Sequence, residues 1–497
     1  MKMLILREST ISTFDIVKSK KHMAFDQSFK ISGSRNQIFF NLYSDHMIRE
    51  CELGVQKRLK RSHYNYFVKK DRIGFLWNTA SDACVLLNET ETEWYNRTEE
   101  TFLTTDFLLY LYDLGFYVEF DLDEQFRIDL LRKKHAYSYP ENGHIDIEIL
   151  PTQHCNARCF YCFEQNYTSL EMGERTISNV VNYICSRVKP KQEICFIWFG
   201  GEPLLGKNAI DKIITQVNNY FGRALRYYSS ITTNNSLIDQ EMLDSFQGLW
   251  RVKDVLTTID GYREEHNRRK AYVRKELDAY TMTLNNLRRL SEIGITTTCR
   301  INLDKDNINQ LSLILKDITP LIEYKNFNVQ ITTLRDKTAS VRSRDKYFSS
   351  EEYYSFYHIV IPLLYEMGFV RDSLSQLPVR DSSNCIACAV NKVVINSNGK
   401  LFKCVQDSLS DDNSVGDCRS GILGNYNYTK WYREIDDLGE KCEHCIFLPC
   451  CQGGCKYYRN NPSFDTTPCF RKKFYIDYII DEIINKYAEE VSLCPIL

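Results

Sequence analysis

Three cysteines, Cys155, Cys159 and Cys162, stand at the spacing Cys-x3-Cys-x2-Cys within the segment PTQHCNARCFYCFEQ. Three thiolates this close together suit three irons of a cubane [4Fe–4S] cluster, because cysteine thiolates are the usual ligands of such clusters. The fourth iron then has no protein ligand nearby and stays open to a small molecule, which makes it a site of reaction. The alternatives are a zinc site or buried thiols, but zinc sites usually pair two Cys-x2-Cys units and no fourth ligand lies close to these three.

A second group of cysteines lies toward the C-terminal end, where ten of the nineteen cysteines fall between positions 385 and 469. The group comprises the spacing Cys442-x2-Cys445-x5-Cys451-x3-Cys455, then Cys469, and upstream Cys385 and Cys388 ahead of Gly399-x4-Cys404. Cys-x2-Cys pairs suit zinc as well as iron–sulfur clusters, so a zinc ribbon remains an alternative for this region.

Eight further thiols belong to neither group: Cys51, Cys84, Cys185, Cys195, Cys299, Cys418, Cys450 and Cys494. Cys185, Cys195 and Cys299 lie in apolar helix or strand runs, where a buried thiol acts as a small hydrophobic side chain. We expect most of these eight thiols to be inert.

The composition is that of a globular protein with several domains. A chain of 497 residues is too long for one core, so two to four domains are expected. The net charge of −2 gives no global field that would attract nucleic acid. The N-terminal MKMLILREST is too short an apolar run for a signal peptide, and no stretch approaches the roughly 20 apolar residues of a membrane span. A cysteine-rich chain of this kind is expected in the cytoplasm, with bound metal rather than disulfides and with no nucleic-acid or membrane partner.

From about 146 to 335 the pattern alternates apolar strands with helix-length segments. Strand-like runs occupy 145–150, 194–200, 227–233, 255–260, 296–303 and 327–334. Successive βα units predict an α/β fold with a parallel sheet and right-handed crossovers, here a partial (β/α)6 barrel. Functional loops on such a sheet follow the strands' C-terminal ends, and the cysteine triplet follows the first strand.

The triplet, together with Gly200-Gly201-Glu202-Pro203 after the second strand, resembles the radical S-adenosylmethionine superfamily. The resemblance implies that the open iron chelates the amino and carboxylate groups of S-adenosylmethionine, and that electron transfer yields a 5′-deoxyadenosyl radical. The residues suit this reading, since two glycines permit close backbone approach at a strand end. The Glu202 carboxylate and nearby backbone groups can accept an ammonium.

Further segments match the same family in order along the chain. Thr258-Ile259-Asp260-Gly261 followed by His266 resembles its S-x-D-G…H stretch, and Thr233-Asn234-Asn235 resembles a TNG turn in which Asn235 tolerates the left-handed backbone. Where the family often has an arginine four residues after the histidine, this chain has Lys270, which weakens the expectation of a carboxylate contact there. The resemblance implies these cofactor-binding residues: Tyr161, Gly200, Gly201, Glu202, Pro203, Thr233, Asn234, Thr258, Asp260 and Arg300.

The C-terminal cysteines resemble the SPASM extension, which carries auxiliary [4Fe–4S] clusters and would bring the total to three. Carried over by position, one cluster takes Cys385, Cys388, Cys404 and Cys455, and the other takes Cys442, Cys445, Cys451 and Cys469. Two alternatives remain open. Only the spacing favours Cys451 over its neighbour Cys450, and either Cys385 or Cys388 can be surplus.

Residues 64–135 read as a small α+β unit, whose runs FLWNTASDACVLLNETE and LYDLGFYVEFDLDE resemble the leader-recognising segment of peptide-maturing radical enzymes. That winged-helix-like module takes an extended peptide as an added strand. Basic residues cluster nearby and can meet an acidic leader, although such a run is usually a solvated face: Lys57, Arg58, Lys60, Arg61, Lys69, Lys70 and Arg72.

The domain boundaries follow from these segments. We expect an unassigned segment at 1–50, a leader-recognition-like domain at 51–140 and a radical enzyme barrel at 141–345. A linking helix at 346–380, a SPASM domain at 381–475 and a C-terminal helix and tail at 476–497 complete the chain.

The resemblance implies a peptide maturase that abstracts hydrogen from a ribosomally made precursor with a leader and receives electrons from a donor such as flavodoxin or ferredoxin. The expected reaction is the formation of a thioether or carbon–carbon cross-link. Sulfatase maturation to formylglycine and peptide epimerisation are the alternatives, and an iron–sulfur electron carrier or a zinc-binding protein is the non-enzyme reading. Sulfatase maturases place a proposed base, an aspartate, directly after the cysteine of G-x4-C. This chain has Val405 there, and Asp407 is the substitute candidate.

Overall fold

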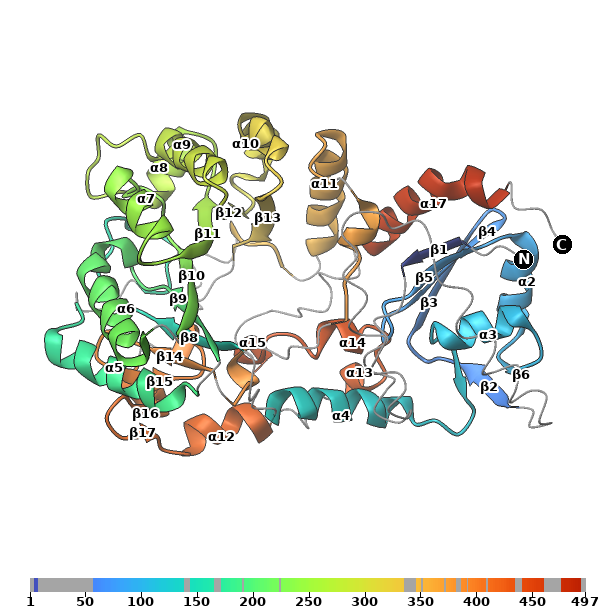
Figure 1. Cartoon of the computed structure of the whole chain (residues 1–497). Helices are drawn as coiled ribbons and strands as arrows, with labels where there is room; N and C mark the ends of the chain where they lie inside the picture. Colours follow the sequence, from blue (N-terminus) through green and yellow to red (C-terminus); the bar gives the residue numbers. More distant parts are fainter. Residues whose placement is uncertain are drawn as a thin grey trace.

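The protein was analysed as a computed structural model of the whole chain (Figure 1). The structure describes residues 4–7, 57–137, 144–164, 171–189, 192–222, 225–334, 346–349, 352–370, 372–380, 386–390, 392–407, 410–433, 440–459 and 475–492. Within these ranges, no helix is both long enough and apolar enough to cross a membrane.

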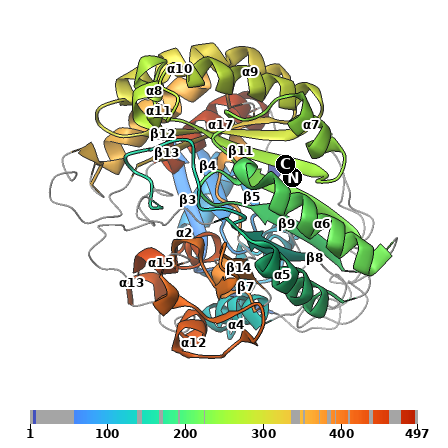
Figure 2. The same ribbon diagram turned by 90° about the vertical axis from the view of Figure 1, so that its left-hand side faces the viewer.

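The centre of the fold is a curved sheet of six parallel strands that follow one another in sequence order. The strands are β8 (His144–Ile149), β9 (Glu193–Trp198), β10 (Arg226–Thr232), β11 (Val252–Ile259), β12 (Thr296–Leu303) and β13 (Phe327–Thr333). The helices between them lie on the outer side of the sheet in Figures 1 and 2: α5 (Glu174–Arg187), α6 (Lys207–Phe221), α7 (Gln240–Gln247), α8 (Glu264–Lys270), α9 (Ala279–Glu292) and α10 (Leu311–Ile318). All six predicted strands are confirmed, and their C-terminal ends meet at one edge.

Buried and less buried residues alternate along the strands, so one face of the sheet packs against the helices and the other forms the inner face. In β11, Val255, Thr257 and Ile259 are buried, whereas the intervening Leu256 and Thr258 are only half-buried. Because successive strand residues point to opposite faces, the apolar residues pack under the helices and Thr258 is left for the inner side. The outer core is mostly aliphatic, with Trp198 and Trp250 fully buried in it.

The sheet continues past its first strand into the C-terminal region. β14 (Val393–Ile395) pairs in parallel with β8, and three short antiparallel strands follow it: β15 (Lys400–Phe402), β16 (Gly416–Asp417) and β17 (Gly421–Ile422). A ten-stranded sheet results. The start of the predicted SPASM region is therefore built onto the barrel sheet by backbone hydrogen bonds.

The N-terminal unit, residues 57–137, contains two small antiparallel sheets, one of which β1 (Leu4–Arg7) joins. Its elements are β2 (Arg58–Arg61), β3 (Asn65–Lys70), β4 (Ile73–Asn78), β5 (Cys84–Leu87), α2 (Glu89–Arg97), β6 (Glu100–Phe102), α3 (Asp106–Asp113), β7 (Tyr117–Glu119) and α4 (Glu124–Tyr137). Asn88 caps α2 in a capping box with Glu91, which satisfies backbone donors at its first turn. The predicted α+β character is confirmed, and the winged-helix-like arrangement stays a prediction.

One face of the N-terminal sheet is covered by the C-terminal end of the chain. Helix α17 (Ile476–Ser492) lies beside β4 and β5, red against blue in Figure 1. Its Ile480 and Ile483 pack with Trp77 and Leu86 in one buried cluster, which also takes in α14 (Leu448–Cys451). The remaining helices are α11 (Tyr353–Glu366), α12 (Tyr426–Arg433), α13 (Glu440–Glu443) and α15 (Lys456–Arg459).

Candidate active site at the strand ends

The cluster loop, residues 155–162, follows β8 and carries the three predicted iron ligands. All three thiols are half-buried. Burial raises the pKa of the Cys155 thiol to about 12, and the nearby charges of Glu202, Cys159 and Cys162 add to the rise. The rise reflects burial and does not by itself distinguish a ligand from an inert thiol, so the fit to an iron cluster rests on three cysteine donors in one short loop.

The three thiols do not surround one point. In the described part of the chain, no three His, Cys, Asp or Glu side chains converge on the position of a single metal ion. A cubane cluster places each thiolate on a different iron, so its ligands need not converge.

Two neighbouring βα loops hold the backbone of the cluster loop in place. The Arg158 amide donates to Lys270 O at 2.8 Å, and the Val273 amide donates to Asn156 O at 2.9 Å. On the other side, Asn234 Nδ2 donates to Asn156 Oδ1 at 2.7 Å. A loop without regular secondary structure is thereby held through two peptide groups on one flank and through the Asn156 side chain on the other.

The two glycines of the GGEP segment allow the loop after β9 to lie directly on the start of the cluster loop. Gly200 has φ of 122°, and a Cβ there would come within 2.5 Å of Thr152 O. A Cβ on Gly201 would stand 2.3 Å from His154 O. The Glu202 amide donates to His154 O at 2.7 Å, and Pro203 begins a short 3-10 helix, Pro203–Gly206. Only glycine fits both positions.

Glu202 is fully buried and joins this segment to the loop after β10. Its carboxylate accepts hydrogen bonds from Thr233 Oγ1 at 2.6 Å, the Asn234 amide at 2.8 Å and the Leu204 amide at 3.2 Å. Burial raises the pKa of Glu202 to about 7, against these hydrogen bonds, which lower it. The contact with a cofactor ammonium stays a prediction. In the structure, the carboxylate holds the loop after β9 against the loop after β10.

Asn235 takes the left-handed conformation expected where the family turn has glycine, with φ of 66°. It is fully buried, and its Nδ2 donates to Thr283 O at 3.2 Å. The substitution of asparagine for glycine therefore keeps the turn.

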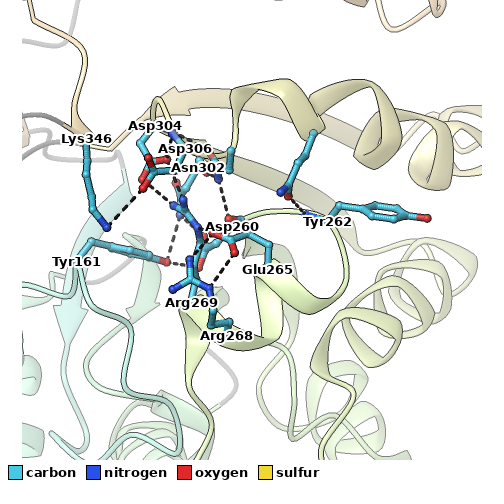
Figure 3. A network of polar contacts seen from close by, with 12 residues as sticks. Tyr161, Asp260, Tyr262, Glu265, Arg268, Arg269, Asn302, Asp304, Asp306 and Lys346 are labelled. Carbon is cyan, nitrogen blue, oxygen red and sulfur yellow. Dashed lines mark hydrogen bonds and ion pairs between the residues drawn. The ribbon is translucent and has the colours of Figure 1, made fainter.

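Tyr161 links the cluster loop to the ends of β11 and β12. Its hydroxyl donates to Asp260 Oδ2 at 2.6 Å, and Asn302 Nδ2 donates to Asp260 Oδ1 at 2.7 Å. Figure 3 shows these three side chains pointing toward one another. Lys270 Nζ completes the group at 3.1 Å from Asp260 Oδ2 and also donates to Tyr161 and Thr258 hydroxyls.

The Asp260–Lys270 pair is charged although both side chains are buried. Burial alone would raise the pKa of Asp260, but the Lys270 ammonium holds it below its usual value. Conversely, the pKa of Lys270 lies well above its usual value because Asp260 and Tyr161 outweigh the effect of burial. Lys270 was expected only as a departure from the family arginine, so its pairing with Asp260 was missed.

A second buried pair lies beside the first and was also missed. Arg269 makes a bidentate contact to Asp304, with Nη1 and Nη2 at 2.7 and 2.9 Å from the two carboxylate oxygens. It also donates to Glu265, as Figure 3 shows. No sequence signal marks this pair, because 35 residues separate Arg269 on α8 from Asp304, which follows β12.

Two other family-matched residues have structural partners. His266 is fully buried, and burial lowers its pKa to about 3, so it is neutral and its Nδ1 accepts the Asp260 amide at 3.2 Å. Arg300, two residues before Asn302 on β12, donates from Nε to Gln330 Oε1 at 2.9 Å. A direct role of Arg300 toward a cofactor stays a prediction.

The predicted auxiliary ligands are partly described. Cys385 and Cys469 lie outside the described residues. Cys388 is fully buried beside Tyr432, whereas Cys404, Cys442, Cys445, Cys451 and Cys455 are half-buried. Cys450 is fully buried in the core with Trp77, and its Sγ lies 3.5 Å from Thr79 O. This packing favours Cys451 over Cys450 as the ligand.

The unassigned thiols agree with an inert role where they are described. Cys84, Cys195, Cys299 and Cys418 are buried and Cys185 is half-buried. Burial raises the pKa of Cys299 and Cys418 to about 12. Cys51 and Cys494 lie outside the described residues.

Asp407 is buried in a 3-10 turn three residues after Cys404. Burial raises its pKa, while Lys430, whose Nζ is 3.4 Å from the carboxylate, lowers it. A carboxylate with a raised pKa is suited to accept a proton.

The basic residues of the N-terminal unit are mostly engaged within the protein. Lys57, Arg58, Lys70 and Arg72 pair with carboxylates, and Lys60 and Arg61 donate to backbone carbonyls. These contacts leave the expected electrostatic capture of an acidic leader without support.

We predict that Gly201→Ala destabilises the barrel by about 1–3 kcal/mol, because the new Cβ would overlap His154 O. Thermal unfolding and iron uptake after reconstitution would measure the effect. Gly173→Ala is the matched control, since a Cβ there meets nothing within 4 Å. Equal behaviour of the two variants would contradict this account of the GGEP segment.

We also predict that Lys270→Met costs about 3–5 kcal/mol in unfolding free energy, because it leaves the buried Asp260 carboxylate uncompensated. Urea denaturation of the iron-free chain would measure it. The double variant Lys270→Met/Asp260→Asn should recover part of the loss. Lys346→Met, which breaks the exposed Lys346–Asp306 pair at 3.4 Å, should cost under about 1 kcal/mol. If Lys270→Met lowers the free energy of unfolding no more than Lys346→Met does, the Lys270 ammonium does not stabilise the buried Asp260 carboxylate.

Comparisons with known proteins agree with the geometry. Residues 149–318 match the Radical SAM superfamily. The radical SAM cyclopropyl synthase TigE of Paramaledivibacter caminithermalis is 22% identical over 382 residues, which cover 70% of this chain and 76% of that protein. The cysteine-type anaerobic sulfatase-maturating enzyme of Clostridium perfringens is 21% identical over 370 residues, covering 67% and 95%.

Among solved structures, native anSMEcpe with bound AdoMet and Cp18Cys peptide superposes with a TM-score of 0.56 at 18% identity, over 69% of this chain and 99% of that one. This likeness shows a shared fold. In this superfamily a bound cluster supplies the electron that splits S-adenosylmethionine into a reactive radical, and Cys155, Cys159 and Cys162 stay the residues predicted to hold it. The chain is therefore a radical SAM enzyme, which uses S-adenosylmethionine and a [4Fe–4S] cluster.

Proposed function

We propose that the chain is a peptide maturase that abstracts hydrogen from a ribosomally made precursor peptide and forms a thioether or carbon–carbon cross-link. The observation that carries this proposal is the N-terminal α+β unit, which lies ahead of the barrel in the sequence. In its four-stranded sheet, β3 is an edge strand. Among the described strands β3 pairs only with β4, so its other edge can receive an extended peptide.

The relatives support a peptide substrate. By its name, the sulfatase-maturating relative acts on another protein, and anSMEcpe has been solved with a bound peptide. TigE is named a cyclopropyl synthase, a class of product in which a new carbon–carbon bond forms. These names favour bond formation on a peptide side chain, and two auxiliary clusters at the C-terminal cysteines would take up the electron released by that step.

Sulfatase maturation is the second candidate, because the sulfatase-maturating relative is covered over 95% of its length. Val405 occupies the place of that family's proposed base, and the substitute Asp407 is buried beside Lys430. Epimerisation is the third outcome and would leave the mass of the peptide unchanged.

The test is anaerobic co-expression of the chain with a short peptide encoded beside it, followed by mass measurement and fragmentation. We expect loss of two hydrogen atoms at a residue joined to a cysteine that no longer reacts with iodoacetamide. A carbonyl that reacts with a hydrazide would establish formylglycine instead. A chain that cleaves S-adenosylmethionine but changes none of the candidate peptides in mass or stereochemistry would contradict the proposal.

Replacement of the three cluster-loop cysteines by alanine is the control for that experiment. Reconstituted wild-type enzyme should form 5′-deoxyadenosine under strong reductant, and the triple variant should form none. Formation of that product by the triple variant would exclude the cluster loop as the reactive site.

We further predict that Asp407→Asn lowers peptide conversion by on the order of 10²-fold, the usual contribution of a general base. Cleavage of S-adenosylmethionine without peptide should persist. The exposed Asp411 offers a matched control, since Asp411→Asn should leave conversion unchanged. Equal conversion rates in the two variants would show that Asp407 is not the general base.

A further inference from the structure

The N-terminal unit contacts a short stretch of chain that lies hundreds of residues away. We call residues 442–455 the auxiliary segment, because they contain four of the proposed ligands of the auxiliary clusters. We infer that the N-terminal unit is a template for the auxiliary iron–sulfur site and that Thr79 is a positioning residue for Cys445. This inference rests on the ligand roles proposed for Cys442, Cys445 and Cys451.

The contacts reach the peptide groups on both sides of Cys445. His63 Nε2 lies 3.1 Å from His444 O, and the Thr79 hydroxyl donates to Ile446 O. Thr79 is fully buried, and its amide donates to Tyr64 O at 3.0 Å within the N-terminal unit. The carbonyl before the cysteine and the carbonyl after it are therefore both fixed from the N-terminal unit.

The ligand side chains themselves pack against the same unit. Cys442 and Cys445 lie against a buried cluster made of Tyr64 and Ile128 from the N-terminal unit and Leu448 from the auxiliary segment. Residues 64 and 128 belong to different elements of the unit, so the thiols face a surface that exists only when the unit is folded.

Phe447 anchors the turn between Cys445 and Cys451. Its ring centroid is 5.4 Å from that of Tyr66 and 5.8 Å from that of Trp77, and the side chain is buried. Phe447 O accepts the Cys451 amide at 2.8 Å. A ring held in the core of the N-terminal unit thereby sets the start of α14 and the place of Cys451.

Cys450, the residue before Cys451, also contacts the N-terminal unit. Its Sγ lies 3.5 Å from Thr79 O and 3.7 Å from Pro378 O, both backbone carbonyls. Thr79 thus contacts the auxiliary segment twice, through its hydroxyl to Ile446 and through its carbonyl to Cys450.

The auxiliary segment has little structure of its own to hold three thiols in place. Its helices α13 and α14 contain four residues each, far below the length at which a helix is stable alone. Groups that orient metal ligands typically change metal affinity by about 10–100-fold. The N-terminal unit supplies that orientation here.

The experiment compares Thr79→Val with Thr92→Val in the full-length chain after anaerobic reconstitution. Thr79→Val removes the hydroxyl that reaches Ile446, whereas Thr92→Val removes an equally buried hydroxyl that donates to Leu87 O inside the unit. The Thr79 hydroxyl also lies 3.3 Å from Tyr64 O inside the unit, but it carries a single hydrogen, so each variant loses one donated hydrogen bond and the thermal stabilities should fall alike. Only in Thr79→Val should iron and sulfide equivalent to one cluster pass to a chelator about tenfold faster than in the wild-type chain, which lowers the iron content after equal exposure.

Thr79→Ser, which keeps the hydroxyl, should restore the iron content and the rate of release. In all variants the cluster at residues 155–162 should still form 5′-deoxyadenosine, which shows that the chain is folded and active at that site. Iron content and release in Thr79→Val that match those of Thr92→Val would overturn the inference. Wild-type enzyme that binds only one cluster would instead refute the proposed auxiliary ligands, and the inference with them.

Discussion

The buried ion pair between Asp260 and Lys270 is the interaction on which the candidate site depends. Burying two charges is costly unless their remaining hydrogen-bonding groups are satisfied. Here Tyr161 and Asn302 bond the carboxylate, while Thr258 accepts from the ammonium. Because Tyr161 belongs to the cluster loop, satisfying this pair also fixes the loop that carries the predicted iron ligands.

The parallel sheet explains why these groups meet. The ends of β8 to β12 lie along one edge, so loops from distant parts of the sequence converge there without long connections. The cluster loop is held by the loops after β9 and β10 on one side and by the end of α8 on the other. Two glycines and the left-handed Asn235 allow backbones to approach more closely than side chains would otherwise permit.

Much of this arrangement could be predicted from the sequence. The six strands could be predicted because buried parallel strands are short apolar runs. The turn at Asn235 could be predicted because asparagine is one of the few residues that tolerate a left-handed backbone. The three internal hydrogen bonds of Glu202 were not predicted, since they depend on the fold. The buried pairs at Lys270 and Arg269 were also missed, because ion pairing between the end of α8 and the carboxylates that follow β11 and β12 leaves no local pattern.

Long-range packing was the least predictable feature. Thr79 and Ile446 are 367 residues apart, and their contact follows from the docking of the N-terminal unit onto the C-terminal helices. Basic residues of that unit suggested a charged surface for a peptide, yet most of them have internal partners. The β14 extension likewise joins two regions that their cysteine patterns had separated.

The central claim is that the iron left open by Cys155, Cys159 and Cys162 binds S-adenosylmethionine. Electron paramagnetic resonance of the reduced enzyme with S-adenosylmethionine labelled with ¹⁵N at its amino group tests this claim most directly. The account predicts a hyperfine coupling between the label and the reduced cluster, retained when the auxiliary cysteines are replaced and lost in Cys155→Ala. A spectrum that the label leaves unchanged, or a coupling that survives in Cys155→Ala, would contradict it.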